Sequence, residues 1–323
     1  MSAIKPKILV IRGGAIGDFI LTLPAIAALR KQFPQAHLEV LGYPHIAQVA
    51  VAGGLADRVQ PIEARGLAGF FARAGTLEPD LMDYFSEFDL VISYLYDPDE
   101  IFKTNLRRCL FGQFIAGPHR PNEAEFIHAT QVYLKPLEQL AIFDADPVPR
   151  LNVGQASSLS QTSSKILSNQ DGDRRDACPT LALHPGSGSE KKNWPEARWA
   201  EFIAWLTGST KLNLLLVGGE AEGGRLKRLV AAVPPARCQV LQNLPLPDLA
   251  RRLQSCAAFV GHDSGISHLA AALGLPTLVL WADTLEEIWR PQGQRVVILR
   301  ELTGVGAIRV EKVIQELRKL AGG

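Results

Sequence analysis

Residues 5–34 read KPKILVIRGGAIGDFILTLPAIAALRKQFP. The run KILVIR, residues 7–12, is the short apolar segment expected of a buried parallel strand. Two glycines follow, and Gly17 and Asp18 then stand at the head of an apolar stretch, in which PAIAALRKQF at 24–33 has the period of an amphipathic helix. This segment therefore predicts a strand, a tight glycine loop and a helix, with a carboxylate at the junction.

The same alternation continues over the first half of the chain. AHLEVLGY at 36–43 and FDLVISYL at 88–95 are two further buried strands. Strands that alternate with helices are typical of βαβ units in a doubly wound parallel sheet. We therefore expect residues 1–153 to form one α/β domain.

The alternation resumes at residue 180. Strands are expected in TLALHPG, LNLLLVGG, AAFVGHDSG and PTLVLWADT, and helices in EARWAEFIAWLTGS, EGGRLKRLVAAV, LPDLARRLQSC, ISHLAAALG and GAIRVEKVIQELRKL. Residues 154–179 are rich in Ser, Gln, Asn and Asp without a period, which predicts an exposed flexible linker or insertion. We expect two Rossmann-like domains, 1–153 and 180–304, whose parallel sheets face a central cleft.

The composition excludes several classes of protein. The chain has 323 residues, 47% apolar and 21% charged, which suits two domains with buried cores. With 34 Lys and Arg against 33 Asp and Glu, the formal charge of +1 argues against a general nucleic-acid binder. The chain shows neither the pattern of a secretory leader nor an apolar run of about 20 residues, so we expect a cytoplasmic protein. The four cysteines have no CxxC spacing, and no motif predicts a metal site.

Four loops that follow expected strands carry polar residues, and ligands bind at that end of a parallel sheet. The first loop holds Asp18, which is either the N-cap of a helix beginning near Phe19 or a general base facing the cleft. A helix N-terminus favours an ionised carboxylate in both roles. The glycines of this loop match neither the dinucleotide fingerprint nor the Walker loop.

The second loop, residues 184–195, reads HPGSGSEKKNWP. Its small residues let backbone N–H groups approach a phosphate, and Lys192 adds positive charge. An ordinary polar surface loop is the alternative.

The third loop follows LNLLLV. Glu220 or Glu222 in this loop is placed either to accept from ribose hydroxyls or to supply an acidic first turn of a helix.

The fourth loop lies within GHDSGISHLA, residues 261–270. A strand runs into an Asp-Ser-Gly turn and then a helix, whose first N–H groups are placed to hold a pyrophosphate, with Ser264 as an added donor. A simple capping turn and a structural His268 are the alternatives. The recurrence of such loops at four strand ends favours a ligand site over coincidence.

Three stretches together resemble glycosyltransferase family 9, the heptosyltransferase family of lipopolysaccharide core assembly. They are RGGAIGDFILTLPAIAALRKQFP, HPGSGSEKKNWP and DSGISHLAAALGLPTLVLWADT. The resemblance covers nearly the whole chain outside the Ser-rich segment. It implies a GT-B fold, with the nucleotide sugar bound mainly by the second domain and the C-terminal helix, residues 305–323, packed back toward the first. It also implies transfer of a sugar, typically a heptose from ADP-heptose, with inversion and without an obligatory metal or other cofactor.

The resemblance also assigns roles by position. Asp18 matches the catalytic base of the family. Arg12, Gly17 and Arg120 are acceptor-side candidates, although a solvated basic surface is the alternative for Arg120. The matching donor-binding residues are Ser187, Lys192, Glu222, Asp263, Ser264, Gly265 and His268.

Several alternatives stay open. Residues 281–284, WADT, depart from the Gly-Pro-Thr-like turn of the family, which leaves the donor sugar undetermined. A nucleotide-sugar 2-epimerase-like isomerase and a catalytically silent nucleotide-sugar-binding protein are the other functions considered. For the transferase we expect a nucleotide-sugar donor and a saccharide or glycolipid acceptor as partners, no nucleic acid, a monomeric state, and at most peripheral contact with the inner face of the cytoplasmic membrane.

Overall fold

Strand β1 (Lys7–Arg12) lies at the centre of a five-stranded parallel sheet with the order β3-β2-β1-β4-β5. Its residues from Ile8 onward are buried, as expected for a strand whose sheet is covered on both faces. Ile8 aligns with Leu38 of one neighbour and with Leu90 of the other. The remaining strands are β2 (His37–Gly42), β3 (Arg58–Pro61), β4 (Leu90–Ser93) and β5 (Gln113–Ala116).

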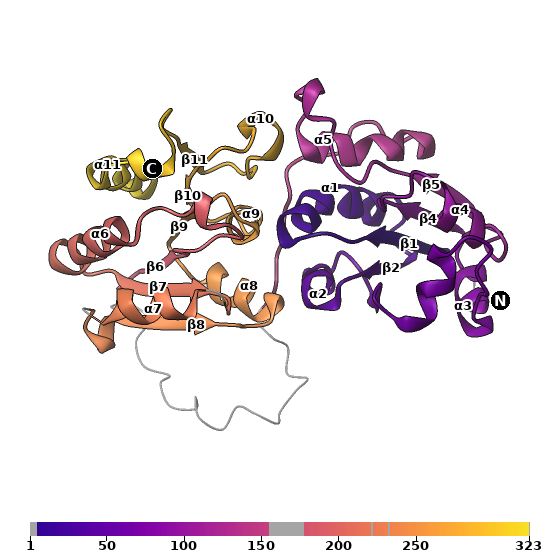
Figure 1. Cartoon of the computed structure of the whole chain (residues 1–323), viewed down its shortest axis with the longest axis horizontal. Coiled ribbons are helices and arrows are strands. Elements are labelled where there is room, and N and C mark those ends of the chain that lie inside the picture. Colours follow the sequence, from indigo (N-terminus) through magenta and orange to yellow (C-terminus); the bar gives the residue numbers. More distant parts are fainter. Residues whose placement is uncertain (1–4, 155–177, 221, 232, 323) are drawn as a thin grey trace. The chain divides into compact units, whose positions relative to one another are not determined.

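The computed structural model describes residues 5–154, 178–220, 222–231 and 233–322 (Figure 1). Its contacts divide the chain into two compact units. Unit 1 comprises residues 1–151 and 284–294, and unit 2 comprises residues 152–283 and 295–323. The predicted linker at 154–179 lies almost wholly outside the described residues.

The helices of unit 1 connect and cover its strands. The long helix α1 follows β1, and α5 packs against it. The α-helices are α1 (Ile16–Gln32), α2 (Pro44–Ala52), α3 (Pro79–Ser86), α4 (Ile101–Leu106), α5 (Ala129–Leu134) and α10 (Glu286–Trp289); the 3-10 helices are η1 (Arg65–Phe71), η2 (Glu123–Glu125) and η3 (Lys135–Leu140).

Unit 2 is built on a six-stranded parallel sheet with the order β11-β10-β9-β6-β7-β8. Its strands are β6 (Thr180–Leu183), β7 (Asn213–Gly218), β8 (Cys238–Gln242), β9 (Ala258–His262), β10 (Thr277–Leu280) and β11 (Val296–Leu299). Its helices are α6 (Glu196–Ser209), α7 (Gly223–Val230), α8 (Leu246–Gln254), α9 (Gly265–Ala272) and α11 (Val310–Gly322), with 3-10 helices η4 (Glu190–Lys192), η5 (Pro235–Arg237) and η6 (Val305–Ala307).

Both sheets therefore have the doubly wound order, in which the winding reverses beside the first strand. The prediction of two parallel α/β sheets is confirmed. The apolar runs do not predict β3, β5, β8 and β11, because each of these strands at the sides of the sheets buries at most one of its residues.

The core of unit 2 contains a group of large aromatic side chains. Trp194, Trp199 and Phe202 are fully buried, and the rings of the two tryptophans meet edge to face with centroids 5.4 Å apart. The indole N–H of Trp194 donates to the carbonyl of Ile308, at 2.9 Å. This bond ties the loop before α6 to the segment before α11, so it fixes one end of the second candidate loop.

The expected packing of the C-terminal helix toward the first domain stays a prediction. Helix α11 packs on α6, β10 and β11, all within unit 2 (Figure 1). Its buried residues Val313 and Leu317 join the same core as Trp194. Residues 284–294, between β10 and β11 in the sequence, are the segment from the second half of the chain that belongs to unit 1.

Two further features bear on the expectations from composition. None of the helices in the described ranges is long and apolar enough to cross a membrane. All four cysteines lie within the described residues, and each has a free thiol.

Candidate active site

Asp18 lies at the carboxyl edge of the unit 1 sheet, beside the point where the winding reverses. Helix α1 begins at Ile16 with Ala15 as its N-cap, so Asp18 is the third residue of the helix. The expectation that Asp18 is the N-cap of a helix beginning near Phe19 is wrong. Gly14 has a φ of +101°, a conformation that favours glycine, and it turns the chain early enough for the helix to start two residues before Asp18.

The carboxylate of Asp18 is held by the loop that precedes it. Its Oδ2 accepts from the backbone N–H of Ala15 at 3.0 Å, which closes the first turn of α1. The side chain keeps 34% of its exposure, so it is oriented but still reachable from solvent. Gly17 lies one residue earlier in the same turn, where it is partly buried.

Arg12 is buried beneath Asp18. Only 3% of its side chain is exposed, and its guanidinium lies 4.4 Å from the ring centre of Tyr133 and 5.9 Å from that of Tyr94. Nη1 donates to the carbonyl of His119 at 2.8 Å, and Nη2 donates to the carbonyl of Asp18 at 3.3 Å. Arg12, an acceptor-side candidate from the sequence, is thus a buried support for the α1 turn.

Arg120 is exposed and makes contacts within unit 1. Its Nη2 donates to Oε1 of Glu123 at 2.7 Å, and its guanidinium lies 5.2 Å from the ring of Trp289. The indole N–H of Trp289 donates to the same carboxylate oxygen, at 3.1 Å. A second bond joins Nε2 of the buried His128 to the carbonyl of Arg290, at 2.9 Å. These contacts attach the 284–294 segment to unit 1.

In unit 2 the second and fourth candidate loops meet in an ion pair. Nζ of Lys192 lies 2.7 Å from Oδ2 of Asp263, whose side chain is 8% exposed. Lys192 belongs to η4 in the loop after β6, and Asp263 directly follows β9. Since β6 and β9 are neighbours at the winding reversal, the pair marks the place where ligands bind in such sheets.

Glu222, in the third candidate loop, contacts the second candidate loop. Its Oε2 accepts from the backbone N–H of Gly219 at 2.8 Å, before the start of α7. A Cβ added to Gly186 would lie 2.2 Å from Cγ of Glu222, so the two loops touch at a position where only glycine fits. Glu220, the competing ribose candidate, is exposed.

The other predicted donor residues lie in the same two loops. The hydroxyl of Ser187 donates to the carbonyl of Ser189 at 2.7 Å and shapes the loop after β6. Ser264 is the N-cap residue of α9, yet its hydroxyl makes no cap bond and lies 3.3 Å from Nδ1 of His184. Gly265 begins α9, and His268 is buried in the first turn.

Two histidines without a role predicted from the sequence hold these loops together. Nε2 of His262 accepts from the backbone N–H of Trp194 at 2.8 Å, so Nδ1 carries the proton and donates to the carbonyl of Gly186 at 3.1 Å. Burial lowers the pKa of His262 to about 4 and that of His184 to about 3. Their signal in the sequence is their position at strand ends, in HPG and HDSG.

These buried histidines predict that acid weakens the fold. Unfolding exposes both imidazoles, which then bind a proton below their ordinary pKa of 6.5, whereas the folded forms bind it only near pH 4 and pH 3. The unfolded state therefore holds more protons in this window, and the free energy of unfolding should drop by about 3 kcal/mol between pH 6.5 and 5. Urea unfolding at pH 7.5, 6.5 and 5 measures this slope.

Matched variants isolate the cause. His262→Gln keeps an acceptor and a donor at the site and should reduce the slope, while His45→Gln on the surface should not. A free energy of unfolding that is equal at pH 6.5 and pH 5 would contradict the prediction.

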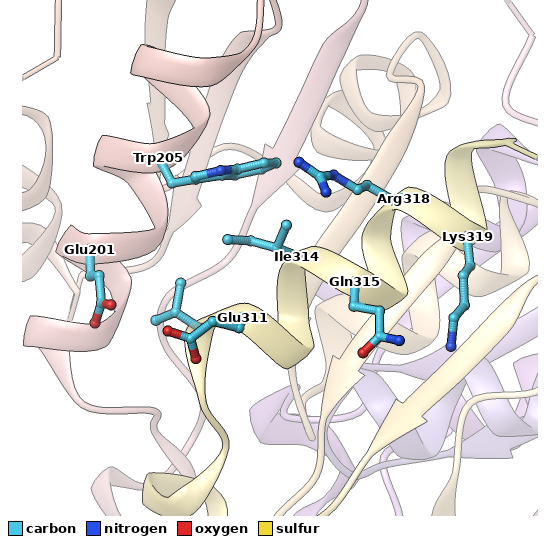
Figure 2. A pocket seen from close by; sticks show the side chains of 8 residues that line it. Glu201, Trp205, Glu311, Ile314, Gln315, Arg318 and Lys319 are labelled. Carbon is cyan, nitrogen blue, oxygen red and sulfur yellow. The ribbon is translucent and has the colours of Figure 1, made fainter.

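The described residues contain no candidate metal site, and they form a groove away from these loops. Within the ranges that the structure describes, no cluster of three or more His, Cys, Asp or Glu side chains is arranged to hold a metal ion. A groove of about 740 Å³ lies between α6 and α11, where Arg318 stacks over Trp205 with its guanidinium 5.2 Å from the ring (Figure 2). None of the candidate residues lines this groove.

Comparison with known proteins identifies the family. The model of glycosyltransferase family 9 (heptosyltransferase) matches residues 126–315, more than half of the chain. The chain belongs to this family. The match includes the second, third and fourth candidate loops of this family 9 protein and begins after Asp18.

Individual relatives agree with this assignment. Lipopolysaccharide heptosyltransferase 1 of Salmonella typhimurium is 38% identical over 96 residues, which are 29% of this chain and 29% of that protein. The structure of E. coli ADP-heptose lps heptosyltransferase II matches with a TM-score of 0.74 and 19% identity over 98% of both chains. The structure of E. coli heptosyltransferase WaaC with ADP matches with a TM-score of 0.71 and 21% identity over 98% of this chain and all of that one. The fold of this family 9 protein is therefore GT-B.

Proposed function

We propose that this protein is an inverting, metal-independent glycosyltransferase. Its donor is a nucleotide sugar, a heptose carried by ADP, and its acceptor is a saccharide or a glycolipid. Family membership supports the reaction class, and the relative solved with ADP supports the nucleotide. The observation that carries the proposal is the contact among three loops of unit 2, through the Lys192–Asp263 ion pair and through Gly186 against Glu222, beside the winding reversal of its sheet.

The donor loops suit a diphosphate that becomes a leaving group. As the bond from the anomeric carbon to the diphosphate oxygen breaks, negative charge gathers on the phosphates. The Lys192 ammonium and the first N–H groups of α9 at Gly265 are placed at one edge of the sheet, where they stabilise that charge. Glu222 then accepts from the ribose hydroxyls of the nucleotide.

Asp18 serves as the general base. The acceptor hydroxyl loses its proton to the carboxylate while its oxygen forms the new bond to the anomeric carbon, opposite to the departing ADP. Attack from the opposite side inverts the configuration of that carbon. Because Asp18 belongs to unit 1 and the donor loops belong to unit 2, the reaction needs residues of both units.

A nucleotide panel tests the donor assignment. We expect ADP to raise the melting temperature more than GDP or UDP, because a ligand that binds only the folded state stabilises it by mass action. At 100 times its Kd, the gain is about 2.7 kcal/mol. A shift by UDP with none by ADP would overturn the ADP assignment.

Product analysis tests the reaction class. ADP-heptose should be converted to ADP and a heptosylated product only when an acceptor is present, with the same rate in EDTA. Isomerised nucleotide sugar formed without acceptor would indicate an epimerase, and binding without any conversion would indicate a silent binding protein. We place the reaction in the cytoplasm and assign it to a monomer that makes at most peripheral contact with the inner face of the membrane. Sedimentation tests the monomeric state, and cell fractionation tests the location.

A further inference from the structure

Three loops of unit 1 begin at the same edge of its sheet, where strands β1, β4 and β5 end. Ile11 of β1 aligns with Ser93 of β4, and Ser93 aligns with Ala116 of β5. Since the strands are parallel, the segments that follow them emerge side by side. These segments contain Arg12, the residues after Tyr94, and the turn through His119.

Tyr96 is an exposed aromatic residue at this edge. Its exposed fraction is 70%, and its ring centre lies 4.5 Å from that of His119, with the planes at 58°. Tyrosine gains free energy when its ring is covered, and its hydroxyl tolerates a wet boundary. A ring left open beside a candidate site is therefore suited to a ligand that covers it.

The backbone on both sides of Tyr96 is anchored. The buried hydroxyl of Tyr94 donates to the carbonyl of Tyr133 at 2.7 Å. On the other side, the carboxylate of Asp97 accepts from the backbone N–H groups of Phe102, at 3.1 Å, and Lys103, at 2.9 Å. The exposed ring is thus presented from a fixed backbone, which lowers the ordering cost of binding a ligand.

One guanidinium links this aromatic pair to the proposed base. Arg12 donates to the carbonyl of His119 and to the carbonyl of Asp18, at 2.8 and 3.3 Å. The backbone turns at His119 and at Asp18 therefore contact the same buried side chain. A ligand on the Tyr96 ring would lie on loops that begin at the same edge of the sheet as the Asp18 turn.

The chemistry of the pair suits a sugar ring. Burial and the charges of Arg12 and Arg120 lower the pKa of His119, so the imidazole is neutral at pH 7. An aromatic face covers the C–H face of a pyranose, and a phenol and a neutral imidazole exchange hydrogen bonds with its hydroxyls.

We propose that Tyr96 and His119 form a platform for the acceptor saccharide, which selects the hydroxyl that reaches Asp18. This inference rests on the proposed function and goes beyond it, because it names the residues that recognise the acceptor. Tyr96 binds through its ring, so the phenol oxygen contributes less than the ring itself.

Titration of the intact protein, in the presence of ADP, tests the platform. The probes are lipopolysaccharide core oligosaccharides, freed of lipid, that carry no heptose or one heptose. The wild type is expected to bind one of them, Tyr96→Ala to bind it about tenfold more weakly, and Tyr96→Phe to stay close to the wild type, as loss of one aromatic contact predicts. Phe111→Ala, which removes a 90% exposed ring just before β5 at the opposite edge of the sheet, should change nothing.

Each result of this titration either supports or overturns the platform. Equal affinities for wild type and Tyr96→Ala, or no binding of either oligosaccharide by the wild type, would overturn the platform. Melting temperatures of the variants that match the wild type exclude misfolding as the cause of a loss. Failure of the proposed function has a different signature, since the wild type would then neither bind ADP nor convert ADP-heptose.

Discussion

Asp18→Asn is expected to lower turnover by about 10²–10⁴-fold, the contribution typical of a general base. Asparagine has nearly the same shape and keeps an oxygen for the N–H of Ala15, so the first turn of α1 should persist. It cannot take the proton of an acceptor hydroxyl, which leaves the nucleophile weak. Steady-state kinetics with ADP-heptose and the acceptor measure the loss in kcat.

The control for this variant is Asp248→Asn. Asp248 is the third residue of α8, as Asp18 is of α1, and it pairs with Arg251 at the surface. It should retain full turnover. Donor affinity should be unchanged in both variants, because Asp18 belongs to unit 1 and Asp248, although in unit 2, lies in α8 outside the donor loops. Turnover of Asp18→Asn within threefold of the wild type would remove Asp18 from the mechanism.

Lys192→Met should lower kcat/KM for the donor by about 10²–10³-fold, the loss seen when one stabilising group is removed from a developing charge. Methionine keeps much of the length and apolar stem of lysine but loses the ammonium that lies 2.7 Å from Asp263. The leaving diphosphate then has fewer positive partners. Kinetics at varied donor concentration separate the effect on kcat from the effect on KM.

Lys191→Met is the matched control for this prediction. Lys191 lies next to Lys192 in η4, but its side chain is exposed. It should change kcat/KM by less than about threefold, because the ammonium that lies 2.7 Å from Asp263 belongs to Lys192. If both lysine variants lose activity equally, general attraction of the anionic donor explains the effect better than a specific contact.

Much of the fold follows from local patterns in the chain. The runs KILVIR and LNLLLVGG predict strands that the structure places in the two sheets, as β1 and β7. Each of these two strands is followed by the glycine loop and the helix expected of a βα unit. These features are local, because side-chain period and glycine conformation act within a few residues. Local patterns are therefore sufficient to select Asp18 and the donor loops as candidates.

The exact start of a helix is harder to predict. The apolar stretch favours a start near Phe19, but the positive φ of Gly14 permits a start at Ile16. The consequence is chemical, because Asp18 moves from capping the helix to a position inside the first turn, where one carboxylate oxygen binds Ala15.

The sequence by itself determined the two parallel sheets, the family and the loops that carry polar side chains. Only the tertiary structure decided that Arg12 lies buried against Tyr133, that Lys192 meets Asp263 across 71 residues, and that the 284–294 segment joins unit 1. The physical reason is that these contacts join residues far apart in the chain. They depend on strand order and on how side chains pack, and neither is encoded in the period of a short segment.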